Sequence, residues 1–173
     1  MIYIVRHGQT DWNLEGRYAG RIDVPLNDKG IEQANIIREE LSNVEFDKVF
    51  SSPLIRAYET AQIICNNKII KDDRIIERCN GDLEGKLKTQ ITDSVDFNDP
   101  NEKKYNIESI IEFRDRIKRF FDEIITYKKE NILVVTHAGV AIYARCYFEG
   151  EPIDNDYNKY KLKNCEIIKY KNN

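Results

Sequence analysis

Residues 132–139 read Ile-Leu-Val-Val-Thr-His-Ala-Gly, and this stretch decides the fold class. The four residues 132–135 are all apolar, which is typical of a parallel strand that helices cover on both faces. Two polar residues, Thr136 and His137, follow at once. A helical pattern then runs from about Ala138 to Phe148. A buried strand that leads directly into a helix indicates an α/β protein.

Strand and helix patterns alternate along the rest of the chain. Short apolar runs predict strands at residues 2–5, 48–50, 75–76 and 165–170. Helical periodicity, with Asn27 as an N-cap and the serines and proline of 51–53 as a start signal, predicts helices at residues 28–41, 53–64 and 107–128. The alternating lysines of residues 159–163 predict an exposed edge strand. We therefore predict a three-layer α/β/α sandwich with a mostly parallel, doubly wound central sheet.

Length and composition fit one soluble domain over residues 1–173. A chain of 173 residues buries roughly 70% of its unfolded surface without staples. The hydrophobic content is 41%, the charged content is 33% and the mean hydropathy is −0.60. The formal net charge of −3 offers no basic field for a nucleic acid or a membrane, so we expect neither as a partner. The sequence predicts no oligomeric state.

Cellular location is predicted from three features. No stretch approaches the ~20 apolar residues of a membrane span. Residues 1–5 lead straight into Arg6 without the pattern of a secretory leader. The 4 cysteines form no C-x-x-C pair, and packing is their expected role, although Cys79 could be sensitive to oxidation. The cytoplasm is therefore the expected compartment.

Candidate functional residues follow the predicted strands. Ligands of doubly wound sheets bind at the carboxyl ends of the strands. His7 follows the first predicted strand, Glu77 follows the strand predicted at 75–76, and His137 follows the central strand. Since the chain has only 2 histidines, both lie where a ligand is expected.

Phosphoryl transfer is the chemistry that these residue types can perform together. Arg6 and Arg56 can each offer a planar fork of donors to a tetrahedral oxyanion, and Asn13 and the amides near Gly8 can add neutral donors. A neutral imidazole can attack phosphorus and form a phosphohistidine. The leaving alkoxide then needs a proton. Carboxylates near the end of the third predicted strand could supply that proton, namely Glu77, Asp73, Asp82 and Glu84.

Four ordered blocks of sequence resemble the histidine phosphatase superfamily, the phosphoglycerate mutase-like proteins. The blocks are residues 6–13 (RHGQTDWN), 23–30 (DVPLNDKG) with Gln33–Ala34, 51–57 (SSPLIRA) with Glu59–Ala61, and 136–139 (THAG), and Glu77 with Gly81 and Glu84–Gly85 lies between the last two. A single Arg-His-Gly tripeptide would be weak evidence. The order of the blocks over most of the chain makes the resemblance specific.

The resemblance implies a role for each candidate residue. His7 would be the nucleophile and Glu77 the proton donor and acceptor. Arg6, Arg56 and His137 would complete the phosphate pocket, with Asn13 as a further donor. Backbone contacts to the ligand are implied at Gly8, Ala19, Gly20 and Ala138. The reaction of this family needs neither a metal nor another cofactor.

Departures from the mutase branch favour hydrolysis. Those mutases are longer and carry an insertion after the Glu-Gly pair, whereas only residues 86–106 separate Gly85 from the long helix here. Asn80 stands where that branch usually has tyrosine. A short lid at about residues 78–106 would let water reach the phosphoenzyme. We therefore expect a metal-independent phosphomonoesterase that acts on a small phosphorylated metabolite.

Other functions remain as alternatives. A phosphoglycerate mutase is the second enzyme candidate, and a non-catalytic module that binds a phospholigand is the candidate of another class. The P-loop motif is absent from the sequence, because Leu87 follows Gly85-Lys86. No cysteine has an arginine six residues later, as a cysteine phosphatase requires. Sugar phosphates, phosphoglycerates, nucleotide-derived phosphates and ribazole phosphate all remain possible substrates.

Overall fold

A five-stranded sheet forms the centre of the computed structural model, which describes residues 1–93, 95–102 and 104–172. The strands are β1 (Ile2–Arg6), β2 (Lys48–Ser51), β3 (Ile69–Lys71), β4 (Ile132–Thr136) and β5 (Ile167–Tyr170). Their order is β3-β2-β4-β1-β5, and only β5 is antiparallel to its neighbour. This is the mostly parallel, doubly wound sheet that the sequence predicted.

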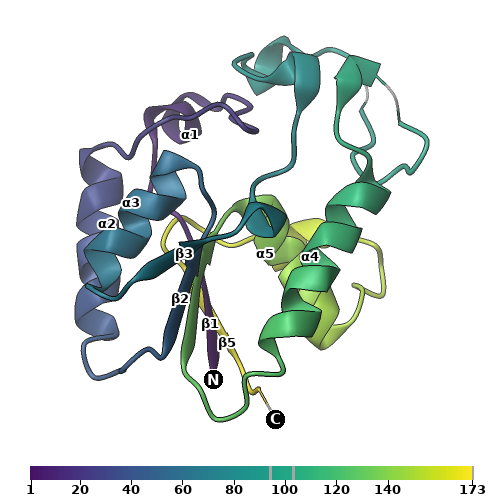
Figure 1. Ribbon diagram of the computed structural model, residues 1–173. Coiled ribbons are helices and arrows are strands. Elements are labelled where there is room, and N and C mark those ends of the chain that lie inside the picture. Colours follow the sequence, from purple (N-terminus) through teal and green to yellow (C-terminus); the bar gives the residue numbers. More distant parts are fainter. Residues whose placement is uncertain (94, 103, 173) are drawn as a thin grey trace.

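Helices cover both faces of this sheet (Figure 1). The helices are α1 (Asp11–Glu15), α2 (Asp28–Glu40), α3 (Ile55–Ile64), α4 (Ile110–Ile124) and α5 (Ala138–Glu149). Short 3₁₀ turns occur at Asp73–Ile75, Gly81–Leu83, Lys88–Gln90, Lys104–Asn106 and Tyr157–Tyr160. Helices α2 and α3 pack on one face, and α4 and α5 pack on the other. The predicted three-layer sandwich is thus confirmed.

Alternation along the central strand β4 divides the core into two halves. Ile132 and Val134 pack with the aromatic residues of α4, and Leu133 and Val135 pack with α2 and α3. All five residues of β4 are buried, as expected for a strand covered on both faces. Burial of a large aliphatic side chain contributes roughly 1.5–3 kcal/mol, so this strand anchors both layers.

Three predicted elements were wrong. The third strand lies at Ile69–Lys71, and Ile75 instead belongs to a 3₁₀ turn that the Asp72 side chain starts by accepting from the Arg74 amide (2.9 Å). The lysine tract 159–163 forms no strand and overlaps a 3₁₀ turn. Ser51–Pro53 does not cap a helix, because α3 begins after Leu54.

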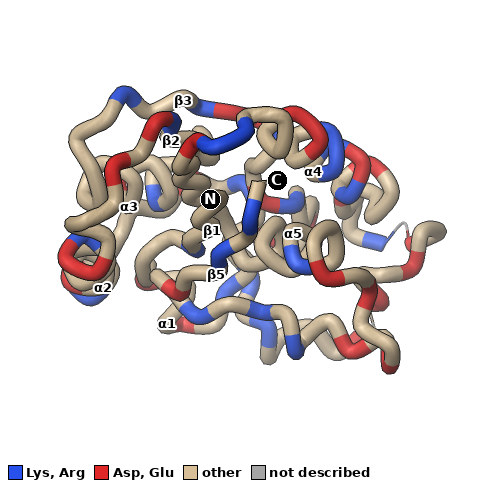
Figure 2. The backbone as a smooth tube through the Cα atoms, turned by 90° about the horizontal axis from the view of Figure 1, so that it is seen from below, with Lys and Arg blue, Asp and Glu red and all other residues tan. Residues whose placement is uncertain are grey.

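The remaining boundaries are close to those predicted. Asn27 caps α2 through its side chain, as expected. Helix α4 is shorter than the predicted helix 107–128, because the Ser109 side chain caps it and it ends at Ile124. No helix among the described residues is long and apolar enough to cross a membrane. Acidic and basic positions are intermixed along the backbone (Figure 2).

Candidate active site

The two histidines meet because β1 and β4 are adjacent and in register. Arg6 pairs with Thr136, so His7 and His137 are the next residues on neighbouring strands. The His7 amide donates to the Thr136 carbonyl (2.9 Å). Their ring centroids lie 5.1 Å apart, and the two residues are only 3% and 0% exposed. The sheet therefore places two imidazoles together at its carboxyl edge.

A backbone carbonyl fixes the tautomer of His7. Its Nδ1 lies 2.7 Å from the Gly8 oxygen, which can only accept a hydrogen bond. Nδ1 must therefore carry the proton, and Nε2 keeps a lone pair. Burial lowers the pKa of His7 well below its usual value, and the charges of Arg56 and Arg6 lower it further. The ring is thus neutral and can act as a nucleophile at neutral pH.

His137 has the opposite arrangement of ring nitrogens. Its Nε2 lies 2.7 Å from the Ser52 hydroxyl oxygen, whereas Nδ1 is buried without a partner in the part of the chain that the structure describes. Burial lowers the pKa of His137 well below its usual value, with further lowering from Arg56 and His7. A neutral ring with its proton on Nδ1 could donate to a bound ligand.

Two buried arginines lie beside the histidines. Arg56 donates to the carbonyls of Ile22 (2.9 Å) and Gly20 (2.7 Å), and Arg6 donates to that of Leu162 (2.8 Å). These contacts fix both guanidinium planes. Burial lowers the pKa of each arginine, but the attraction of Glu77 opposes this effect, and guanidinium groups stay protonated in proteins.

Three buried nitrogen atoms in this site have no hydrogen-bond partner among the described residues. They are Nε of Arg6, Nε of Arg56 and Nδ1 of His137. A buried donor without a partner costs roughly 1–3 kcal/mol, so native proteins rarely leave one unpaired without a functional reason. Donors of this number and type match a tetrahedral oxyanion such as phosphate.

Glu77 lines the same cavity as His7, Arg6 and Arg56. One carboxylate oxygen accepts from the Arg78 amide (2.9 Å), and the other accepts from the Gly139 amide in the first turn of α5 (3.2 Å). A Cβ atom at Gly139 would lie 2.5 Å from Oε1 of Glu77, so only glycine permits this approach. The other carboxylates that the sequence left open, Asp73, Asp82 and Glu84, do not line the cavity.

The cavity has a volume of about 510 Å³. Eight of the ten predicted site residues line it, namely Arg6, His7, Asn13, Ala19, Gly20, Arg56, Glu77 and Ala138. His137 lies beneath its surface. Gly8 does not line the cavity, and its amide donates to the Thr60 hydroxyl (3.0 Å) instead. The amide of Gly8 is therefore already paired within the protein.

Asn164 is a site residue that sequence reasoning missed. Its Nδ2 donates to the His7 carbonyl (2.9 Å) and to Oδ1 of Asn13 (3.1 Å). Oδ1 of Asn13 also accepts from the Thr10 amide (3.2 Å), so the side chain of Asn13 is left with its Nδ2 as a donor. No motif surrounds Asn164, because its contact with His7 spans 157 residues of sequence.

The outer cavity contains further residues that no motif indicated. Its basic residues are Arg17, Arg78, Lys88 and Lys161, and its aromatic residues are Tyr18, Phe97, Phe113, Tyr143 and Tyr157. Burial lowers the pKa of Lys88, and the neighbouring charges of Lys161 and Arg6 lower it further. Lys88 therefore lies close to other positive charges, and Asp96 and Asp156 also line the cavity. No group of three His, Cys, Asp or Glu residues with metal-binding geometry occurs among the described positions.

Comparison with known proteins gave consistent matches. The model of the histidine phosphatase superfamily (branch 1) matches residues 2–172. Phosphoserine phosphatase 1 of Hydrogenobacter thermophilus is 34% identical over 98% of this chain and 83% of its own length. The metal-independent phosphoserine phosphatase of Arabidopsis thaliana is 36% identical over 83% of this chain and 67% of its own length.

A solved structure gives the same result. The phosphoserine phosphatase of Entamoeba histolytica in complex with 3-phosphoglyceric acid superposes with a TM-score of 0.82 and 25% identity. The match covers 96% of this chain and 87% of that chain. The resemblance inferred from the sequence blocks is therefore confirmed.

Proposed function

Because the chain belongs to branch 1 of the histidine phosphatase superfamily and is a phosphatase, we propose that it hydrolyses its substrate through a phosphohistidine at Nε2 of His7. The observation that carries this proposal is the set of three unpartnered donors around a neutral histidine. They supply charge stabilisation where the phosphoryl group passes, which is usually the largest catalytic contribution.

The proposed first step transfers the phosphoryl group to the enzyme. The Nε2 lone pair of His7 forms the N–P bond while the P–O ester bond breaks. The departing alkoxide takes a proton from the carboxyl group of Glu77. Arg6, Arg56 and Nδ1 of His137 donate to the three equatorial oxygens, with Asn13 as a further donor. Ala19, Gly20 and Ala138 would provide backbone contacts at the rim.

The second step returns the enzyme to its starting state. Water attacks phosphorus, loses a proton to the carboxylate of Glu77, and the N–P bond breaks. Inorganic phosphate leaves, and both electrons of the broken bond return to Nε2 of His7. No metal enters either step, in agreement with the Arabidopsis relative, a metal-independent phosphoserine phosphatase.

Phosphoserine is the substrate that we propose to test first. The two relatives described above are phosphoserine phosphatases. Its carboxylate would suit the positive charges of Lys88 and Lys161, and its phosphate would suit the inner donors. The other small phosphomonoesters that the sequence left open belong in the same panel.

We further propose that residues 1–173 form a single domain in which residues 78–106 act as a short lid. Within this segment, residues 94 and 103 lie outside the described residues. Val95–Asn98 line the cavity opposite the sheet, which supports a covering role. A short cover would admit water and favour hydrolysis over the transfer that a mutase performs.

We also propose that the protein acts in the cytoplasm. Its four cysteines are free thiols, which is typical of proteins in a reducing compartment.

Trapping of the phosphoenzyme tests the proposal. Incubation with ³²P-labelled phosphoserine and a quench in base should yield a label on the protein that acid removes. The label should be absent from His7→Ala and retained on the control His137→Ala at a lower rate of formation. A label on His7→Ala would contradict the mechanism, as would activity that disappears with a chelator. Tight phosphate binding without turnover of any phosphoester would favour the non-catalytic module.

A further inference from the structure

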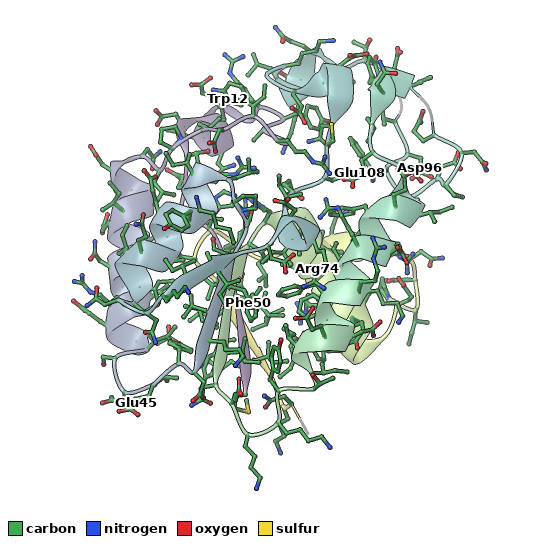
Figure 3. All side chains as sticks on the ribbon, viewed as in Figure 1. Trp12, Glu45, Phe50, Arg74, Asp96 and Glu108 are labelled. Atoms are coloured by element: carbon green, nitrogen blue, oxygen red, sulfur yellow. The ribbon has the colours of Figure 1, made fainter. Side chains whose placement is uncertain are left out.

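Glu108 and Arg116 form a buried, two-pronged ion pair next to the segment that carries Glu77. Arg116 lies in α4, and Glu108 lies just before that helix; Figure 3 labels Glu108 near the N-terminal end of α4. Nε of Arg116 lies 2.9 Å from Oε1 of Glu108, and Nη2 lies 3.0 Å from Oε2. Each side chain is only 11% exposed. This parallel geometry holds both groups in one orientation.

Further hydrogen bonds of the pair reach the main chain around Glu77. Arg116 donates to the carbonyls of Arg74 (2.7 Å) and Glu77 (3.2 Å). Oε2 of Glu108 accepts from the Cys79 amide (3.2 Å). The backbone amide of Glu108 also donates to the Cys79 carbonyl (2.9 Å). The chain is thus held on both sides of Glu77.

No strand or helix could hold this segment instead. Residues 76–80 lie between two 3₁₀ turns and belong to neither a helix nor a sheet ladder. Buried backbone groups outside regular structure need other partners. Arg21 adds a further contact, because it pairs with Glu108 (3.0 Å) and donates to the Glu77 carbonyl (3.3 Å). Neither Glu108 nor Arg116 lines the cavity, so neither contacts a ligand bound there.

We propose that the Glu108–Arg116 pair is a positioning device that sets the Glu77 carboxyl group for proton transfer to the leaving group. This inference rests on the proposed function, in which Glu77 is the proton donor. A displacement of about 1 Å at a reacting group can cost ~100-fold in rate. The clamp is therefore expected to affect proton transfer and to leave the attack by His7 intact.

Two substrates distinguish an effect on proton transfer from an effect on the attack by His7. Phosphoserine releases an alkoxide that needs a proton, whereas p-nitrophenyl phosphate releases an acidic phenol that does not. We expect Glu108→Gln and Arg116→Met to lower kcat/KM for phosphoserine by about 10- to 100-fold and to change kcat/KM for the aryl ester by less than about 3-fold. This ratio reports the steps up to phosphoenzyme formation, so it leaves out the later hydrolysis, in which Glu77 accepts a proton from water with either ester. Arg116→Lys keeps the charge without the planar fork and should restore part of the loss.

The matched control is Arg119→Met, because Arg119 is an exposed arginine of the same helix that pairs with Asp115 (3.4 Å). It should behave as the wild type with both esters. If Arg116→Met does not fold, the conservative variants Glu108→Gln and Arg116→Lys carry the test. Equal losses of kcat/KM with both esters, or no loss with either, would overturn the positioning role.

Glu77→Gln separates failure of this inference from failure of the proposed function. It should show the same selective loss of kcat/KM with phosphoserine. If Glu77→Gln lowers kcat/KM equally for both esters, the assignment of Glu77 as proton donor is wrong. If Glu77→Gln is selective and Glu108→Gln is not, only the positioning role is wrong.

Discussion

Each of the two site histidines has one ring nitrogen committed to the protein and one left for the ligand. The Gly8 carbonyl holds Nδ1 of His7, and the Ser52 hydroxyl holds Nε2 of His137. The two rings therefore present opposite nitrogens to the same space. One is suited to attack and the other to donation, although both residues follow parallel strands in the same way.

Ser52→Ala should lower activity without removing any group that contacts the substrate. Without the hydroxyl, the ring of His137 loses the bond that orients it, so Nδ1 no longer aims at the phosphoryl oxygen. We expect kcat for phosphoserine to fall by roughly 10- to 100-fold, less than the 10²–10³ typical of removing a transition-state donor itself. Steady-state kinetics at saturating substrate provides the measurement.

Ser51→Ala is the matched control for this substitution. Ser51 is also fully buried, and its hydroxyl donates to the Ser52 carbonyl (2.9 Å). It has no hydrogen bond to either histidine among the described contacts. Activity of Ser51→Ala should stay within about 3-fold of the wild type. Equal losses in both variants would show that a buried hydroxyl matters here only for packing.

Local sequence was sufficient to predict residues that the fold brings together at the candidate site, but not those that orient them. Arg6 is the last residue of β1, and His7 and His137 directly follow β1 and β4, where the topology brings side chains together. Ser52 and Asn164 contact these residues across 85 and 157 positions of sequence. Such contacts depend on the finished packing, and no spacing in the chain indicates them.

Secondary structure was predictable where burial on a defined face controls the pattern. The strand β4 is buried along its whole length, so its apolar run was unambiguous. The strand β3 has two exposed residues out of three at the edge of the sheet, and its pattern could not be distinguished from that of Ile75–Ile76. Helix α1 was missed because it has no buried face and depends on the capping box of Thr10 and Asn13.

Gly30 in α2 provides a prediction at the scale of an element. Alanine in a helix is usually better than glycine by up to ~1 kcal/mol. A Cβ at Gly30, however, would lie 2.1 Å from the Gln9 carbonyl oxygen, which is backbone and cannot rotate away. We expect Gly30→Ala to lower the free energy of unfolding by about 1–3 kcal/mol, as overpacking usually does.

Urea unfolding of Gly30→Ala and of Lys29→Ala would check this expectation. Lys29 is the exposed neighbour of Gly30 in the same helical turn, and its ion pair with Glu32 (2.8 Å) is largely solvated. Surface pairs of this kind contribute ~0–1 kcal/mol, so Lys29→Ala should change stability little. A Gly30→Ala protein as stable as the wild type would mean that α2 can move away from the loop after β1.

At the scale of the whole molecule, a mixed distribution of charge contrasts with a local cluster of buried basic residues at the candidate site. The net charge is −3, and acidic and basic positions are intermixed along the backbone (Figure 2). Arg6, Arg56, His7 and His137 are nevertheless buried close together at the candidate site. Burial lowers the pKa of both imidazoles, and repulsion from the guanidinium groups lowers it further, so the rings are neutral in the folded protein at neutral pH. The folded protein therefore binds protons at these two histidines more weakly than the unfolded chain does.

The weaker proton binding of the two histidines in the folded protein predicts how stability depends on pH. In the unfolded chain both histidines titrate near 6.5, whereas in the folded protein burial and the arginines hold the pKa of His7 and of His137 well below that value. Below pH 6.5 the unfolded chain therefore binds protons that the folded protein does not. The free energy of unfolding should fall as the pH decreases from 6.5, by up to ~1.4 kcal/mol per pH unit for each histidine.

Urea unfolding between pH 7.5 and 5.5 measures this slope before most carboxylates titrate. The wild type should lose stability steadily below pH 6.5 and should show no such loss above it. A His7→Gln/His137→Gln double variant has no imidazole to protonate, so its stability should change much less over the same range. Parallel curves for the two proteins would show that the histidines already bind protons in the folded state. In that case His7 would not be neutral in the resting site, and its attack on phosphorus would first require loss of a proton.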